Sequence, residues 1–216
     1  MPTPAYLGEI GTAYSAAAAT TLTITTTAAV PAGSALFVTV RAGSGIFVSS
    51  VTDSASNAYS LVGRFTTGNT ASMFAVVVPV ALASGATVTI TTSGSVASIQ
   101  ANAFAFTNLT LTGTAVASQT ASGTTSTSGS VTPAQYSGVV ISLVTLNAPI
   151  ATPTLTTANG LTATSFSGTQ MQAMAYRVTT DRAARSVVWT ESGSSHIWAQ
   201  VIVALNAVNA DFLALF

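Results

Sequence analysis

The polar residues between Val51 and Tyr59 are the first place in this chain where chemistry could occur. The stretch reads VTDSASNAY and sets Asp53 and Asn57 between apolar and aromatic residues. Asp and Asn side chains commonly cap turns by bonding nearby backbone amides, whereas a calcium loop needs about six oxygen ligands or more. Because the stretch offers a single carboxylate, we expect the corner of a hairpin here and no metal site.

His196 is the only histidine and therefore the only imidazole available for acid–base catalysis. Ser194, Ser195 and Glu191 are close to it in the sequence, and Asp181 precedes them, so the residue types of a hydrolase triad are present. His196 also opens the apolar stretch HIWAQVIVAL, which is typical of a strand. We expect a histidine at a strand end, no catalytic residues, no cofactor and no enzymatic activity.

The only charged cluster surrounds Asp181 and contains Arg177, Arg182 and Arg185. Two interpretations stay open, a solvated hairpin tip and a polar docking contact for a protein partner. Three arginines are too few for a nucleic-acid surface. We therefore treat the three arginines as candidate partner contacts.

Trp189 and Trp198 lie in successive predicted strands. Aromatic rings stack on the apolar faces of sugars, so the pair could form the floor of a glycan-binding face. Tryptophans in such strands are more often part of a core. A glycan partner is therefore an open alternative without further support.

Composition limits the classes of function. Charged residues make up 5 % of the 216 residues, against about 25 % in typical soluble domains. The formal net charge is zero, which offers no electrostatic attraction to nucleic acid or an anionic membrane. The longest apolar run, Met73 to Ala83, is interrupted by a proline and is too short for a spanning helix, which needs about 20 residues. There is no cysteine, and hence no disulfide or thiolate metal site.

The N-terminal sequence MPTPAYLGEIGT lacks the basic and apolar regions of a secretory signal. We expect a protein that is made in the cytoplasm and either stays in the cell that made it or leaves by assembly or lysis. Its polar surface consists of hydroxyl and amide groups, which protect sheet edges from aggregation less well than charges do. We therefore expect partners to cover that surface.

Short alternating stretches predict an all-β fold. In TLTITT, Leu22 and Ile24 alternate with threonines, which is the period of a half-buried strand. Gly, Pro and Asn turn signals separate many such stretches, and no stretch has a convincing helical period. The predicted fold is a jelly-roll-like antiparallel β-sandwich.

An internal repeat divides the chain. The stretch from Met73 to Ser95 aligns with the stretch from Met171 to Ser194, so that Thr91 matches Thr190. Farther on, the matched residues are Ile99, Ala101 and Asn108 with Ile197, Ala199 and Asn206. The predicted organisation is a first β-sandwich repeat over residues 1–110, a second over 111–207 and an apolar tail over 208–216. The two repeats are also compatible with one compact domain.

The stretch VSSVTDSASNAYSLVGR, followed by SMFAVVV, GATVTITTSGS and ANAFAFTNL, resembles a loose class of β-sandwich proteins. This class occurs among bacteriophage structural proteins and bacterial surface or secreted proteins, and its recurrent element is V-x-D-x-x-G-N-x-Y. Here Ser56 stands where the element has glycine. The resemblance covers mainly residues 30–110 and implies a β-sandwich with a structural role.

The tail VNADFLALF contains four large apolar residues, Phe212, Leu213, Leu215 and Phe216. Such residues are unusual at a chain end unless something covers them. Two destinations stay open, a contact with a neighbouring subunit or particle and a last edge strand on the same domain.

Together these observations predict a structural virion protein of a tailed bacteriophage. The expected role is a capsid decoration or accessory protein on the outer capsid surface, present as a homo-oligomer, with a trimer as the expected state, and bound to the major capsid protein. The alternatives are a phage tail or baseplate protein and a carbohydrate-binding or adhesion module. No nucleic-acid or membrane partner is expected.

Overall fold

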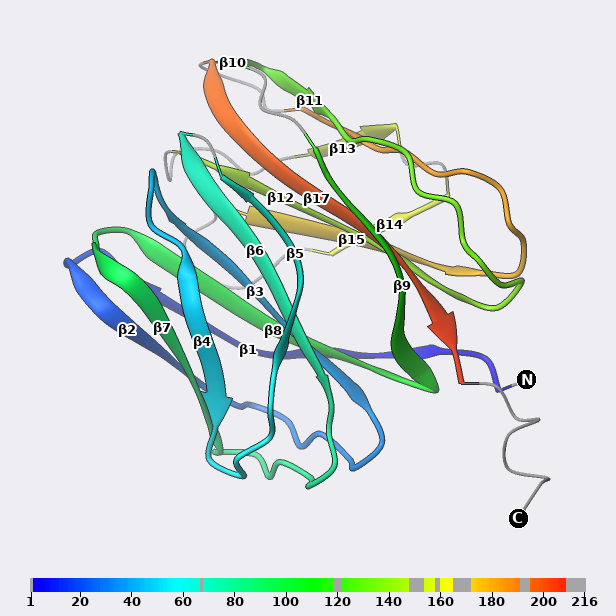
Figure 1. Cartoon of the computed structure of the whole chain (residues 1–216), viewed down its shortest axis with the longest axis horizontal. Helices are drawn as coiled ribbons and strands as arrows, with labels where there is room; N and C mark the ends of the chain where they lie inside the picture. Colours follow the sequence, from blue (N-terminus) through cyan, green and yellow to red (C-terminus); the bar gives the residue numbers. More distant parts are fainter. Residues whose placement is uncertain are drawn as a thin grey trace.

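The computed structural model describes residues 2–66, 68–118, 122–147, 154–157, 160–164, 172–190 and 195–208. Every regular element in these ranges is a β-strand, and all the paired strands run antiparallel (Figure 1). The sheets pack against one another, which confirms the prediction of an all-β antiparallel sandwich. The jelly-roll connectivity and the internal duplication stay predictions.

The first half of the chain forms two sheets. Inner sheet I has the order β1-β8-β3-β6-β5, and outer sheet I has the order β2-β7-β4. The strand bounds are β1 Ala5–Ser15, β2 Ala19–Thr25, β3 Ala35–Gly43, β4 Val48–Asp53, β5 Ser60–Thr66, β6 Asn69–Val77, β7 Thr87–Val96 and β8 Ile99–Thr107.

The second half forms the other two sheets. Inner sheet II has the order β17-β12-β15-β14, and both β9 and the short β10 pair with β17 at its edge. Outer sheet II has the order β11-β16-β13. The bounds are β9 Leu109–Ser118, β10 Ser122–Gly123, β11 Thr125–Thr127, β12 Gly138–Leu146, β13 Thr154–Thr157, β14 Thr162–Thr164, β15 Gln172–Thr179, β16 Val188–Thr190 and β17 His196–Ala207.

The four sheets stack as layers with a core in each interval (Figure 1). Outer core I lies between outer and inner sheet I, the central core lies between the two inner sheets, and outer core II lies between inner and outer sheet II. This stacking explains why the middle strands are apolar at almost every position. In β3, Leu36 and Val38 enter outer core I, whereas Ala35 and Phe37 enter the central core, because successive side chains of a strand point to opposite faces.

The two halves follow the same strand order. β1-β8-β3-β6-β5 in inner sheet I corresponds to β9-β17-β12-β15-β14 in inner sheet II, and β2-β7-β4 corresponds to β11-β16-β13. An isolated bridge joins Val30 to Leu82 in the first half, and another joins Val131 to Arg185 in the second. Among the described strands, no sheet mixes the halves, and the change from one set of sheets to the other falls between β8 and β9.

The strand positions do not agree with every residue match of the predicted repeat. Met73 and Met174 both enter the central core from the strand beside the middle strand, so Met174 is the positional counterpart of Met73. The aligned Met171 lies outside the described residues. Ala101 packs in outer core I, whereas Ala199 packs in the central core, so this match joins opposite faces. A shift by an odd number of residues reverses every side chain of a strand, and Met174 lies three positions after Met171. Small apolar residues on both faces of these strands hid the reversal in the sequence.

Candidate functional site

The polar stretch after β4 folds into a turn held by Asp53. Its Oδ1 atom accepts hydrogen bonds from the backbone amides of Ala55 at 2.9 Å and Asn57 at 3.0 Å. Its Oδ2 atom accepts from Asn57 Nδ2 at 2.9 Å and from the Tyr59 hydroxyl at 3.0 Å. The carboxylate is therefore occupied by its own turn, as a structural corner requires.

Asn57 anchors this turn to the loop after β6. Its Nδ2 atom donates to the Val80 carbonyl at 3.1 Å, and its Oδ1 atom accepts from the Val80 amide at 3.2 Å. Ser56, in the middle of the turn, has a φ of 60°, which is the left-handed conformation that favours glycine. Burial first, and then the charge of Asp53, raise the pKa of Tyr59 above its usual value. The turn is thus a closed hydrogen-bonded unit.

His196 begins β17 and is 4 % exposed. Its Nδ1 atom lies 3.3 Å from Asn147 Oδ1, which also accepts a hydrogen bond from the Ile197 amide at 3.1 Å. This contact holds the end of β12 beside the start of β17. Of the other residues considered for a triad, Glu191 and Ser194 lie outside the described residues, and Asp181 binds Arg185. Within the described ranges, no group of three or more His, Asp or Glu residues could hold a metal ion.

Trp189 and Trp198 do not form the glycan-binding face that the sequence left open as an alternative; they lie in a core, as such residues more often do. Both side chains are 0 % exposed and pack in outer core II. Trp189 Nε1 donates to Ser142 Oγ at 3.1 Å, and Trp198 Nε1 donates to the Gly123 carbonyl at 2.8 Å. The rings fill the interval between inner and outer sheet II, because the two strands present them toward each other across that interval. Large aromatic rings with a satisfied N–H suit such a core.

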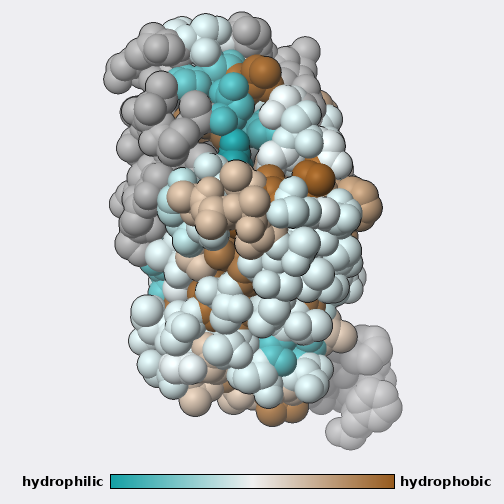
Figure 2. Space-filling model, turned by 90° about the vertical axis from the view of Figure 1, so that its left-hand side faces the viewer, coloured by the Kyte–Doolittle hydropathy of each residue, from teal (hydrophilic) through white to brown (hydrophobic). Residues whose placement is uncertain are grey.

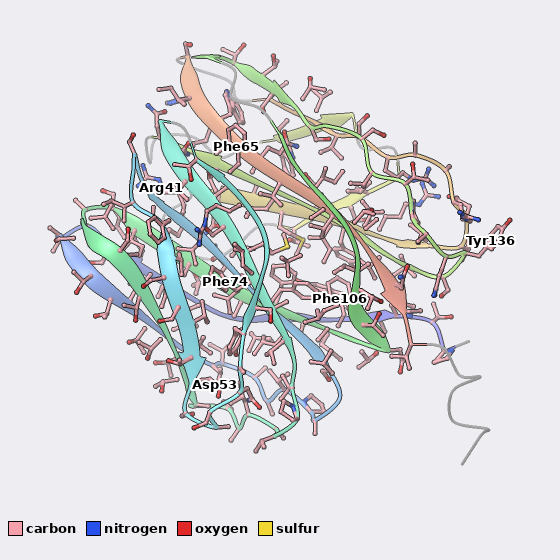
Figure 3. The ribbon with its side chains drawn as sticks, in the orientation of Figure 1. Arg41, Asp53, Phe65, Phe74, Phe106 and Tyr136 are labelled. Atoms are coloured by element: carbon pink, nitrogen blue, oxygen red, sulfur yellow. The ribbon has the colours of Figure 1, made fainter. Side chains whose placement is uncertain are left out.

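Arg41 is a buried cation that sequence reasoning did not single out. It lies in β3 and is 5 % exposed (Figure 3). Its Nε atom donates to the Leu146 carbonyl at 3.0 Å, Nη2 donates to the Asn147 carbonyl at 2.9 Å, and Nη1 donates to the Ser98 carbonyl. Burial lowers the pKa of this guanidinium below its usual value. Arg41 thus ties inner sheet I to the end of β12 in inner sheet II.

The central core is polar next to Arg41. Asn69 Nδ2 donates to Thr145 Oγ1 at 3.0 Å across the two inner sheets, and Thr145 pairs with Gln172 between β12 and β15. Gln172 is 0 % exposed, and neither atom of its side-chain amide has a hydrogen-bond partner in the described structure. The two inner sheets thus meet through polar side chains at this end of the central core.

The predicted charged cluster is a structured corner, here called the arginine corner and defined as Arg177, Asp181, Arg182 and Arg185. Arg185 Nη2 donates to both carboxylate oxygens of Asp181, at 2.7 and 2.8 Å, and Arg177 Nη2 lies 3.8 Å from Asp181 Oδ2. The Ala183 amide donates to Asp181 Oδ1 at 2.9 Å. This amide, followed by the two arginines, lowers the pKa of Asp181.

Only part of the arginine corner is open to a partner. Arg185 is buried, and its backbone bridges to Val131, so its role is internal. Arg182 is exposed, and the side chain of Arg177 is 34 % exposed. The structure therefore brings together Arg177 and Arg185 around one carboxylate and leaves Arg182 outside that ion-pair cluster.

Tyr136 adds an aromatic side chain at the same end of the molecule. It is 66 % exposed and points away from the sheets (Figure 3). It precedes β12, whose first residue Gly138 pairs with Thr179, two residues before Asp181. Sequence reasoning missed Tyr136. The available signal was a tyrosine in the turn-forming context TPAQYSG, where proline, serine and glycine argue against a core strand.

Comparison with known proteins found no matching family model, no matching curated protein and no matching solved structure. In the described part of the chain, no helix is long and apolar enough to cross a membrane. The predicted contact residues Phe212, Leu213, Leu215 and Phe216 lie outside the described residues.

Proposed function

We propose that this chain is a structural virion protein of a tailed bacteriophage, acting as a decoration or accessory protein on the outer capsid surface. One observation carries the proposal: the described carboxylates and the histidine that could act in catalysis make structural contacts instead. Asp53 closes a turn, His196 joins two strand ends and Asp181 binds Arg185. These groups build the fold, and that use supports the proposed non-enzymatic role.

The outer face of outer sheet I supports a role in assembly. The outward side chains stand in register across β2, β7 and β4, and all of them are hydroxyl-bearing: Thr21, Thr23, Thr25, Thr87, Thr89, Thr91, Ser50 and Thr52. Figure 2 views the molecule from this side, and residues of intermediate hydropathy cover most of its coloured surface. Such a face has methyl and hydroxyl groups but no charge to repel a protein lattice.

The partner contact is assigned to the exposed part of the arginine corner and to Tyr136. Arginine and tyrosine are enriched in the energetically important parts of protein interfaces. Arg182 and Tyr136 are exposed on neighbouring loops, and Arg177 lies at the rim of the corner. We propose that this end of the molecule docks on the major capsid protein.

The oligomer is also a proposal. The shared strand order of the two halves supports an origin by duplication of one β unit, which would give each chain two similar outer faces. We propose that these chains form homo-oligomers, with a trimer as the expected state, and that the protein resides in the virion after synthesis in the host cytoplasm.

The test is the copy number in purified particles, measured by quantitative mass spectrometry, together with binding of the purified protein to expanded capsids. Hundreds of copies and saturable binding are the expected results. A few to some tens of copies would indicate a tail or baseplate protein, and absence from particles would refute a virion role.

A matched pair of variants tests the docking end. Arg182→Ala combined with Tyr136→Ala should abolish or weaken capsid binding without lowering the melting temperature. The control, Ser44→Ala combined with Ser84→Ala in loops of the first half, changes the same number of exposed side chains and should keep binding. Equal binding by both double variants would show that the docking end is elsewhere.

A further inference from the structure

A regular grid of hydroxyl-bearing side chains covers the outer face of outer sheet I. These residues, here called the threonine grid, are paired in register across β2, β7 and β4: Thr21, Thr91 and Ser50 in the first row, Thr23, Thr89 and Thr52 in the second, and Thr25 and Thr87 in the third. All of them are exposed or half-buried. The register shifts of this sheet lie before Thr21 in β2 and before Ser50 in β4, so the grid itself is unbroken.

The residues between the grid positions hold the threonine grid in place. Leu22 and Ile24 of β2, Val88 and Ile90 of β7 and Val51 of β4 are buried in outer core I. Because successive side chains of a strand point to opposite faces, burial of these residues turns the grid residues outward. The grid is therefore a surface whose spacing is fixed by the sheet below it.

The hydroxyl groups of the threonine grid can bind a ligand. Ser49 and Thr92, which lie beside the grid, donate to the backbone carbonyls of Thr91 and Thr20. Within the described part of the chain, the hydroxyls of the grid itself make no hydrogen bond to another residue. No grid position carries a charge. A matching ligand is therefore neutral, offers many hydrogen-bonding groups and repeats in two directions.

The geometry of a β-sheet sets the spacing of the threonine grid. Neighbouring strands lie about 4.7–4.9 Å apart, and alternate residues of one strand lie about 6.8 Å apart. In ice, each oxygen atom is hydrogen-bonded tetrahedrally to four others. An O–H···O length of about 2.75 Å then places second-neighbour oxygens about 4.5 Å apart and repeats the stacked layers about every 7.3 Å. The differences, about 0.3 Å across the strands and about 0.5 Å along them, are smaller than the movement of a hydroxyl between rotamers.

Threonine suits a surface that orders water. Its hydroxyl joins a hydrogen-bonded water network, and its methyl group restricts the orientations of first-shell water. A charged side chain would instead orient water around itself, and the threonine grid has none. We propose that the threonine grid binds the surface of an ice crystal through water that is ordered on its methyl and hydroxyl groups.

The twist of the sheet limits the matched area. Adjacent strands rotate relative to one another by about 20–25°, so a face of three strands fits a flat crystal plane over a few rows only. We therefore expect adsorption to ice and slowed recrystallisation, and no large depression of the freezing point.

The threonine grid lies on the opposite side of the molecule from Tyr136 (Figures 1 and 3). Docking through the arginine corner and Tyr136 would leave the grid in contact with water. The inference therefore goes beyond the virion proposal and does not depend on it.

Ice-affinity partition of the purified full-length protein tests the proposal. Ice that grows slowly from a dilute solution excludes most solutes and retains proteins that adsorb to its surface. The natural protein should be enriched in the ice fraction and should slow recrystallisation in a frozen sucrose solution.

Two variants of the middle row test the assignment to the threonine grid. Thr23→Lys places a long charged side chain on β2 and should lose both effects, and Thr52→Lys should do the same from β4. The matched control is Thr162→Lys at an exposed position of β14, which should keep both effects. The melting temperature shows whether each variant is folded, and one folded grid variant is enough for the comparison.

Enrichment of the natural protein and of the control, with loss in the grid variants, supports the proposal. Absence of the natural protein from the ice fraction overturns it, and equal enrichment of the grid variants overturns the assignment to this face. Light scattering tests a second copy of the chain as the competing occupant. An oligomer that Thr23→Lys converts to monomers would give the face to that copy and overturn ice binding. These experiments use purified protein without capsids, so their failure is separate from failure of the proposed function.

Discussion

Arg41 in β3 donates a hydrogen bond to the main-chain carbonyl of Leu146 at the end of β12, 3.0 Å away and on the opposite side of the central core. The same guanidinium binds the carbonyls of Asn147 and Ser98. A buried arginine thus satisfies three backbone acceptors where the two inner sheets meet.

Replacing Arg41 by Met should therefore destabilise the protein by about 2–4 kcal/mol. The change keeps apolar contacts but leaves the carbonyls of Leu146, Asn147 and Ser98 without their donor, and hydrogen bonds to charged groups are worth about 1.5–3 kcal/mol each before relaxation. Urea unfolding measures the free energy. Arg182→Met at an exposed position is the control and should change the stability by less than about 0.5 kcal/mol.

Ser56→Gly should stabilise the protein by up to about 1 kcal/mol. The left-handed conformation that Ser56 adopts costs a residue with a Cβ atom about 1–2 kcal/mol, and glycine avoids this cost. Glycine also has more conformational freedom in the unfolded chain, which offsets part of the stabilisation. Ser54→Gly in the same turn is the matched control, because Ser54 does not have a positive φ. It should destabilise by about 0.5–1 kcal/mol. If both variants lost stability equally, backbone strain at position 56 would be disproved.

Gly63→Val should destabilise the protein by about 1–3 kcal/mol through overpacking. A Cβ atom at Gly63 in β5 would lie 2.6 Å from Val201 Cγ1 in β17, where the two inner sheets approach closely. Gly123→Val is the control, because its nearest neighbour would be 4.0 Å away. Thermal melting of both variants tests the close approach, and equal melting temperatures would refute it.

The stability should decrease as the pH rises from about 10 to about 12, and Tyr6 should account for part of that decrease. Burial first, and then the charges of Tyr176 and Glu9, raise the pKa of Tyr6 from 10.0 to about 12. In this interval the unfolded state loses the phenolic proton while the folded state keeps it. The unfolded state therefore binds fewer protons, and the free energy of unfolding falls as the pH increases.

Tyr6→Phe keeps the ring that packs on Phe106 and Tyr176 but removes the titrating group. The variant should therefore lose less stability than the natural protein between about pH 10 and 12, as measured by urea unfolding at several pH values. Tyr136→Phe, at a ring that is 66 % exposed, serves as the control for removal of a phenol. Parallel pH curves for natural protein and Tyr6→Phe would contradict the assignment.

Much of the architecture was predictable because the order of apolar and polar residues in a strand reflects which of its faces are buried. The alternation of Leu22 and Ile24 with threonine identifies a sheet with one face in a core and one face in water. The largely apolar sequence of β12 identifies a strand buried on both faces. The turn at Asp53 was predictable for a similar reason, because the short polar side chains bond to their own backbone.

The sequence by itself determined the alternating strands and the local turns, since these depend on residues close in the chain. Tertiary structure decided which surfaces are covered. It buried Trp189 and Trp198 between two sheets, left Tyr136 exposed and joined Arg41 to Leu146, which is more than a hundred positions away. A period of two shows that a side chain enters one face of its strand, but the sheet that stacks on that face comes from elsewhere in the chain. Exposure and long-range pairing are therefore fixed only when the layers assemble.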